Sequence, residues 1–381
     1  MGIEQEQQEE QQQHQQQQHQ QQWQQKQYQP RIYDVTDGIP SNQTREVYQR
    51  YFNRFLDYIK IKDRQVLLDF SPKVIKQMIA DYILYLHEKR NVKRDSIKVQ
   101  LSAILRFFQI NNDEFHLTTR NFQRDLPPNE STSSPYGDDR PYTTEEIALT
   151  LQSCDLRTRV AILLLCSSGM RIGALHSLQI GDLTTVRINN SNNIYKIQVY
   201  ARTRDKYYTF CAPECYSTIA DYYLADRKRC GEKLNDKSPL IREQFNAENP
   251  FTINSPRFVS TRGIEYMISH TLKRAGVRKP KAIHMSHGFR KFFKSQAEYS
   301  LMKSINIELL MGHNIGVSGH YYRPTEAEVL EDFKKAIDSL TISSENRLKK
   351  QLETTEQRHS AEWEALKAQM NDLRELLNLK V

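Results

Sequence analysis

Two segments of this chain carry basic side chains at spacings that suit a phosphate group. His287 and Arg290 stand three residues apart, so one helical turn directs both side chains toward the same point. Upstream, Arg171 follows the turn at Gly169 and begins a short amphipathic stretch. Two arginines and a histidine can bind the oxygens of a phosphodiester and stabilise negative charge that grows there during a reaction.

A candidate nucleophile follows these basic residues. Gly312 and His313 form a Gly-His dipeptide, and Tyr322 stands nine residues after the histidine, directly beside Tyr321. A phenol oxygen can attack phosphorus and form a covalent ester with DNA. Taken alone, each such residue has an ordinary structural role, for example as a surface ion pair or a packed aromatic. Their common order, Arg…His-x-x-Arg…His…Tyr, indicates phosphoryl transfer.

This order resembles the active-site pattern of the tyrosine recombinase family (lambda-integrase-like, or phage integrases), and in particular the integrases of archaeal elements. The resemblance covers residues 142–337 and rests on the segments Ser168–Leu178 and His287–Tyr322. The family spacing of nine residues after the Gly-His histidine selects Tyr322 over Tyr321. The resemblance implies chemistry without metal or ATP, so we expect no cofactor. The sequence agrees, because it has neither a carboxylate cluster nor a glycine-rich loop ending in Lys-Ser/Thr.

The resemblance implies a role for each residue. Tyr322 would attack a backbone phosphate and form a 3′-phosphotyrosyl link. Arg171 and Arg290 would hold the non-bridging oxygens and stabilise the pentavalent transition state. His287 would act as a general base or as a donor to phosphate, and His313 as a hydrogen-bond donor.

A predicted β-hairpin carries the candidates for the general acid. Residues 194–200 alternate apolar and polar side chains, and residues 207–211 are rich in aromatics, with a polar turn between them. In the family, a lysine of this hairpin protonates the leaving 5′ oxygen. The basic residues of the turn are Arg202, Arg204 and Lys206. Lys206 is favoured, because an ammonium group can give up a proton and a guanidinium scarcely can.

One position departs from the family pattern. The family often has an acidic residue three positions after the first arginine, and this chain has Ala174 there. Support for the guanidinium of Arg171 is therefore missing or comes from elsewhere in the chain.

Composition favours a polyanionic partner. The 381 residues carry a formal charge of +8, with a pI of about 9.0. Five cysteines without a Cys-x-x-Cys pair indicate reduced thiols. No stretch of 18 apolar residues and no signal peptide are evident, so we expect no membrane partner and a cytoplasmic, nucleoid-associated protein.

Hydrophobic periodicity predicts a mainly α protein with two domains. Residues 1–37 form a Gln/His-rich tail that is expected to be disordered, and residues 38–125 a helical, SAM-like core DNA-binding domain. Between its second and third helices lie cations that are candidates for binding the DNA backbone: Lys89, Arg90, Lys93, Arg94 and Lys98. Residues 126–141 are rich in Pro and Ser and predict a linker.

The second predicted domain, residues 142–337, is a mixed α+β catalytic domain with the small hairpin. Thr143 and Glu146 stand at the separation of a capping box and predict the start of its first helix, and another helix is predicted to start at Pro324. Before its His-x-x-Arg segment, Lys279 and Lys281 are further candidates for DNA contact. Residues 338–381 form a C-terminal helix with a 3-4-3-4 apolar pattern, which predicts either a short coiled coil or an amphipathic helix packed on the core. The residues of this pattern are Trp363, Leu366, Met370, Leu373 and Leu377.

The leading hypothesis is a site-specific recombinase or integrase of a mobile element. It would act on double-stranded DNA as a dimer that forms a tetramer in synapsis, with accessory DNA-bending proteins as further partners. The alternatives are a type IB topoisomerase, which relaxes supercoils without site dependence, and a catalytically silent DNA-binding regulator. A coiled-coil scaffold would explain none of the active-site segments.

Overall fold

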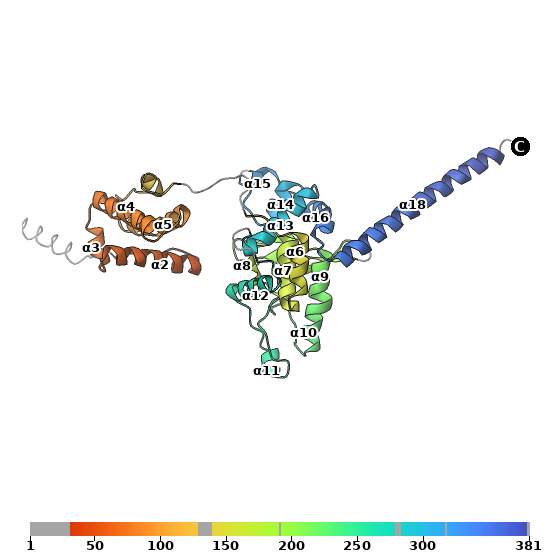
Figure 1. Ribbon diagram of the computed structural model, residues 1–381, viewed down its shortest axis with the longest axis horizontal. Coiled ribbons are helices and arrows are strands. Elements are labelled where there is room, and N and C mark those ends of the chain that lie inside the picture. The colour runs from red at the N-terminus through yellow and green to blue at the C-terminus, as the bar shows by residue number, and fades with distance from the viewer. Residues whose placement is uncertain (1–30, 129–138, 190–191, 279–282, 317, 379–381) are drawn as a thin grey trace, which may run out of the picture. The chain divides into compact units, whose positions relative to one another are not determined.

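A computed structural model of the protein describes residues 31–128, 139–189, 192–278, 283–316 and 318–378 (Figure 1). The chain forms two compact units that divide between Ser133 and Ser134, inside the segment predicted as a linker. Most of the Gln/His-rich tail lies outside the described residues, as do Lys279 and Lys281. The predictions for these segments therefore stay predictions.

The first unit is helical, as its periodicity predicts. Its core is formed by the apolar faces of three long helices, where Phe52 and Phe107 lie with ring centroids 4.4 Å apart and Phe55 packs on Tyr82. The elements are α2 (Asn42–Ile59), α3 (Arg64–Leu68), α4 (Pro72–Glu88), α5 (Arg94–Asn111) and the 3₁₀ turn η1 (Thr119–Phe122).

The second unit is built around α7 (Leu156–Ser168), in which residues 160–166 are all apolar and buried. Helices α12 (Thr261–Arg274) and α13 (Met285–Tyr299) pack against it, as Figure 1 shows. Before it, α6 (Thr144–Gln152) begins at the predicted capping box, in which Thr143 accepts from the Glu146 amide and Glu146 accepts from the Thr143 amide.

The remaining helices of this unit are shorter, apart from the last. Thr325 and Glu328 form a second capping box at the helix predicted to follow Pro324. The remaining helices of the second unit are α8 (Ile172–Leu175), η2 (Ile180–Asp182), α9 (Pro213–Ser217), the π-helical η3 (Thr218–Leu224), α10 (Ala225–Arg229), α11 (Pro250–Ile253), α14 (Ser304–Leu310), α15 (Ser318–Tyr321), α16 (Glu326–Lys334), α17 (Ile337–Leu340) and α18 (Ser344–Asn378).

A three-stranded antiparallel sheet includes the predicted hairpin. The order is β1 (Leu183–Arg187), β2 (Asn193–Val199), β3 (Tyr207–Phe210), with Leu183 opposite Ile197 and Lys196 opposite Phe210. The mainly α class with a small sheet is thus confirmed. Strand β1 was not predicted, since only one of its five positions is a clear apolar β-branched residue.

The cysteines are free thiols, as predicted, and burial raises the pKa of the Cys166 thiol above its ordinary range. Among the described residues, no helix is both long enough and apolar enough to span a bilayer.

Candidate active site

The turn after α7 places Arg171. Gly169 ends this helix with φ +64°, and a Cβ atom there would lie 2.3 Å from the ring of Phe293, so only glycine fits. The chain then extends through Met170, and Arg171 becomes the N-cap residue of α8 with an exposed side chain. Arg171 Nη1 donates to the carbonyl of Gly312, 3.1 Å away.

Arg290 reaches the same place from α13. Its side chain is buried, in contrast to that of Arg171. It donates to the carbonyl of Gly169, to the carbonyl of Met311 at 2.7 Å and to Nε2 of His313 at 2.5 Å. The two guanidinium groups therefore bind consecutive carbonyls of the Met311–Gly312 turn, although they are 119 positions apart in the sequence.

The site has an excess of positive charge. Burial and, after it, the neighbouring charge of Arg171 lower the pKa of the Arg290 guanidinium. Two cations close together with one of them buried favour binding of an anion, because an anion relieves their mutual repulsion.

Arg171 has no acidic neighbour at position 174. Ala174 is fully buried in the core. The carbonyl of Gly312 accepts the hydrogen bond from Arg171 instead. Of the two alternatives that the sequence left open, missing support or support from elsewhere in the chain, this contact, which is remote in sequence, fits the second.

His313 is oriented by a carboxylate that the sequence analysis missed. Its Nδ1 bonds to Glu308, so Nδ1 carries the proton and Nε2 accepts from Arg290. Lys294 Nζ also donates to Glu308, at 2.7 Å. Burial alone would raise the pKa of Glu308, but the hydrogen bonds from Lys294 and His313 lower it below its ordinary value. To donate to a phosphate, His313 would need a proton on Nε2 as well as on Nδ1.

Glu308→Gln is expected to lower the free energy of unfolding by about 1 kcal/mol at neutral pH. The folded pKa of Glu308 is depressed, so its contribution is present above the ordinary pKa of 4.5 and is lost as pH falls through the folded value. In urea unfolding, the difference between wild type and variant should shrink between about pH 5 and pH 3. Glu298→Gln is the control, because Glu298 contacts Lys294 at 3.9 Å without touching His313. If both variants lowered the free energy of unfolding equally, the hydrogen bonds of Glu308 to Lys294 and His313 would not be the source of the stability.

His287 lies on the first turn of α13, one turn before Arg290, as its spacing predicts. Its side chain is exposed. The helix therefore presents an accessible imidazole and a buried guanidinium on successive turns.

The hairpin turn adjoins the arginines. Thr209 of β3 donates to the carbonyl of Ser168 at 2.9 Å, which attaches the strand to the end of α7. The ring of Tyr207 packs on Gly312, where a Cβ atom would lie 2.4 Å from it. Burial raises the pKa of Tyr200, while the charges of Arg171 and Arg290 oppose the rise. The buried Tyr207 hydroxyl lies near Arg290 but makes no hydrogen bond of normal geometry with any described residue.

The structure separates the three candidates for the general acid. Arg202 is held by Asp182 at 2.6 Å, by Gln179 at 2.9 Å and by the carbonyl of Ser177 at 2.8 Å. Its guanidinium is thus occupied in joining the turn to η2. Arg204 and Lys206 are exposed at the turn.

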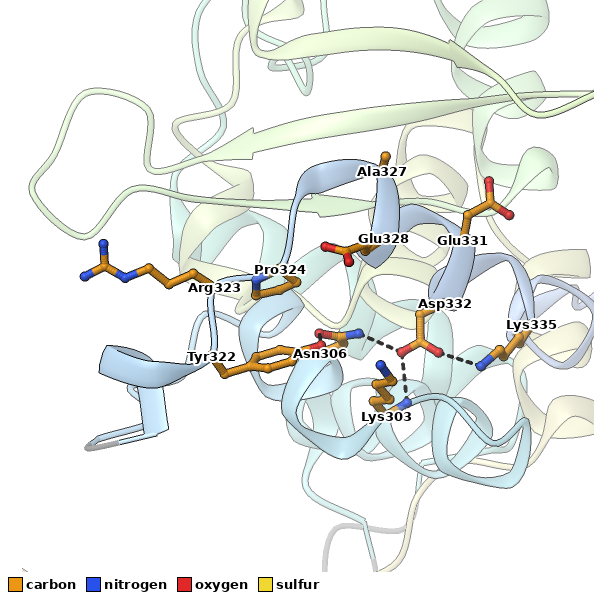
Figure 2. A pocket seen from close by; sticks show the side chains of 10 residues that line it. All are labelled: Lys303, Asn306, Tyr322, Arg323, Pro324, Ala327, Glu328, Glu331, Asp332 and Lys335. Carbon is orange, nitrogen blue, oxygen red and sulfur yellow. Dashed lines mark hydrogen bonds and ion pairs between the residues drawn. The ribbon is translucent and has the colours of Figure 1, made fainter.

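Tyr322 lies apart from the arginines. Its hydroxyl donates to Oδ1 of the buried Asn306 at 2.9 Å, and Asn306 Nδ2 donates to Asp332 at 2.8 Å (Figure 2). Asp332 also accepts from the amide of Lys303 at 2.9 Å and from Lys335 Nζ at 2.8 Å. The pocket that contains Tyr322 is lined by Lys303, Asn306, Arg323, Pro324, Ala327, Glu328, Glu331, Asp332 and Lys335, and by none of the arginines or histidines described above.

Tyr321, the other candidate phenol, ends α15 and is 86% exposed. The two adjacent tyrosines are therefore held differently, because only Tyr322 has a buried hydrogen-bond partner.

No protein-family model and no curated protein matches the chain. Among solved structures, the XerH site-specific recombinase bound to palindromic difH substrate, in a post-cleavage complex, matches 71% of this chain and 72% of its own, with 15% identity and a TM-score of 0.51. The chain has the tyrosine recombinase fold. Two further solved structures match. The Tn1549 transposon integrase in complex with a circular intermediate DNA has 16% identity and a TM-score of 0.49, and the match covers 77% of this chain and 94% of that chain. A lambda integrase dimer bound to a COC′ core site has 16% identity and a TM-score of 0.47, and the match covers 77% of this chain and 92% of that chain.

The narrower resemblance to integrases of archaeal elements is not supported by these comparisons and stays a prediction. The tyrosine recombinase fold accounts for the helical first unit and for the hairpin beside the helices of the second.

In the first unit of this tyrosine recombinase fold, three of the candidate DNA-binding cations, Lys89, Arg90 and Lys93, lie between α4 and α5, and the other two lie within α5. Lys89, Arg90 and Lys93 are exposed. Arg94 instead donates to Gln123 at 2.6 Å and to the carbonyl of Pro127, and Lys98 pairs with Asp95 at 3.0 Å. Arg94 thus has a structural role within this unit, because it ties the start of α5 to residues 123–127.

Proposed function

We propose that this protein is a site-specific DNA recombinase, or integrase, of a mobile element, which cuts and rejoins DNA through a 3′-phosphotyrosyl intermediate. One observation carries the proposal: Arg171 and Arg290 come from distant segments and bind the same turn, Met311–Gly312, beside His313. A phosphodiester could replace the carbonyls as acceptor for both guanidinium groups.

In the proposed reaction, the phenol oxygen of Tyr322 attacks phosphorus and the bond to the 5′ oxygen breaks. The phenol proton passes to a base, for which His287 is the candidate, and the 5′ oxygen takes a proton from Lys206. Arg171 and Arg290 stabilise the extra charge on the non-bridging oxygens. The phosphotyrosyl ester preserves the bond for religation, so the chemistry is a transesterification in both directions.

DNA contact by the first unit fits this function. The exposed cations Lys89, Arg90 and Lys93 suit the phosphate backbone, which is bound without reading sequence. Assembly as a dimer on DNA and a tetramer in synapsis is part of the proposal. The lambda integrase comparison structure is itself a dimer bound to a core site.

The position of Tyr322 implies a step before cleavage. Its hydroxyl must leave Asn306 before it can approach a phosphate held by Arg171 and Arg290. In this proposal the hydrogen bond to Asn306 stabilises the resting position and slows cleavage.

Asn306→Leu is therefore expected to increase the initial rate of covalent complex formation about fivefold, since one hydrogen bond contributes about 1 kcal/mol. Lys335→Ala is the matched control, because Lys335 contacts Asp332 but not the tyrosine. Melting temperatures of both variants establish that they fold. A slower or unchanged rate in a folded Asn306→Leu protein would show that the Asn306 contact does not hold back the nucleophile.

The function is tested by covalent trapping and strand exchange. The full chain is incubated with nicked duplexes drawn from the DNA that flanks its own gene, and denatured with SDS. We expect SDS-resistant protein–DNA complexes on some of these duplexes and recombinant products when two such sites are supplied. In a parallel assay on a supercoiled plasmid, relaxation without site dependence would instead indicate a topoisomerase. Tight binding without any adduct would indicate a silent regulator.

A further inference from the structure

The last helix carries an uncovered apolar stripe. Helix α18 is continuous from Ser344 to Asn378 (Figure 1). Each described member of the stripe is between 50% and 61% exposed: Leu352, Trp363, Leu366, Met370 and Leu373. These exposures exclude the alternative in which the stripe packs on the core of its own chain, as far as the described residues show. Such a large apolar surface favours a partner.

The stripe follows a heptad repeat. Trp363 and Met370 take a positions, and Leu366 and Leu373 take d positions. A strict seven-residue repeat suits a left-handed two-stranded coiled coil. The segment 363–373 covers about 16 Å of helix at about 1.5 Å per residue, so its contact area is modest.

The charges beside the stripe specify a partner and an orientation. Glu362 occupies a g position and Lys367 the following e position. In a parallel pair, g of one helix faces the e position five residues later on the other, so Glu362 meets Lys367 of a second copy, twice by symmetry. An antiparallel pair would bring g against g and e against e, and would separate these two charges.

Both charges are free to change partners. Within one helix, Glu362 accepts from Arg358 at 2.9 Å and Lys367 donates to Glu364 at 3.0 Å. These are exposed ion pairs within three or four residues, which contribute little to stability.

We propose that α18 binds α18 of a second copy of this chain as a parallel two-stranded coiled coil, so that the protein forms dimers in the absence of DNA. This inference goes beyond strand transfer, because it requires neither a phosphodiester nor Tyr322. Two copies would reach DNA already paired. Core positions further toward the N-terminus hold Glu356 and His359, so the pairing depends on residues 363–373 and is reversible on dilution.

The first test is the mass of the full chain without DNA, measured by sedimentation equilibrium over a range of concentrations. We expect a reversible equilibrium between the 44.9 kDa chain and twice that mass. The double substitution Leu366→Gln and Leu373→Gln should weaken dimerisation by at least about 100-fold, because glutamine keeps the helix but removes apolar contact. Ala368→Gln, on the opposite face, is the control and should leave the equilibrium unchanged. A wild type that stays monomeric throughout would overturn the inference.

The second test exchanges the charges. Glu362→Lys alone and Lys367→Glu alone should each weaken dimerisation by about tenfold, since each places like charges opposite one another. An equimolar mixture of the two variants should restore wild-type affinity, because the mixed dimer recovers both opposite-charge pairs. Dimers that are insensitive to these exchanges would refute the parallel arrangement. Covalent trapping is measured separately, so a dimer without an adduct would leave this inference standing while the proposed function fails.

Discussion

Tyr322→Phe is expected to abolish the covalent protein–DNA complex, whereas Tyr321→Phe is expected to retain it. The phenol oxygen is the atom that forms the bond to phosphorus, and no other group of the side chain can replace it. Loss of the nucleophile should reduce adduct formation by a factor on the order of 10⁴ or more. The measurement is the yield of SDS-resistant complex on nicked duplexes, followed by mapping of the peptide that remains linked to DNA.

The adjacent tyrosine makes the comparison decisive. Tyr321 is exposed and Tyr322 is bound to Asn306, so Tyr321→Phe leaves the hydrogen bond to Asn306 intact. Tyr322→Phe should still bind DNA, because phenylalanine preserves the ring. The reverse result, in which only Tyr321→Phe loses the adduct, would move the nucleophile by one residue.

Arg290→Ala and Arg171→Ala are each expected to slow cleavage by about 10²–10³-fold, as is typical when one donor to a developing oxyanion is removed. Their effects on folding should differ. Arg290 is buried and donates to Gly169, Met311 and His313, so its loss leaves buried acceptors unpaired and lowers the free energy of unfolding by about 2–3 kcal/mol. Arg171 is exposed, and its loss should change stability little. Single-turnover adduct formation and urea unfolding measure the two effects.

Arg229→Ala is the control for the loss of a cation. Arg229 is exposed and pairs only with the nearby Asp226 among the described residues. It should reduce neither cleavage nor stability appreciably. If Arg171→Ala cleaves as fast as Arg229→Ala, then Arg171 does not bind the reacting phosphate. The hydrogen bonds of Arg171 and Arg290 to the Met311–Gly312 turn would then only stabilise the fold.

Local signals in the sequence were sufficient for most of the fold. Apolar residues at three- and four-residue steps predicted the helices of the first unit, and the spacing of Thr143 and Glu146 predicted the start of α6. The alternation in residues 194–200 predicted β2, while β1 was missed because its pattern is weak. These signals are local, since helix periodicity and capping depend on residues within one or two turns.

The sequence by itself also determined which residue types stand in the active-site order, from Arg171 to Tyr322. Only the tertiary structure decided how they are held. The binding of Arg171 and Arg290 to one turn and the contact of Tyr322 with Asn306 join different elements. No local periodicity encodes such contacts, because they arise when buried helices bring distant polar groups together and those groups must find hydrogen-bond partners.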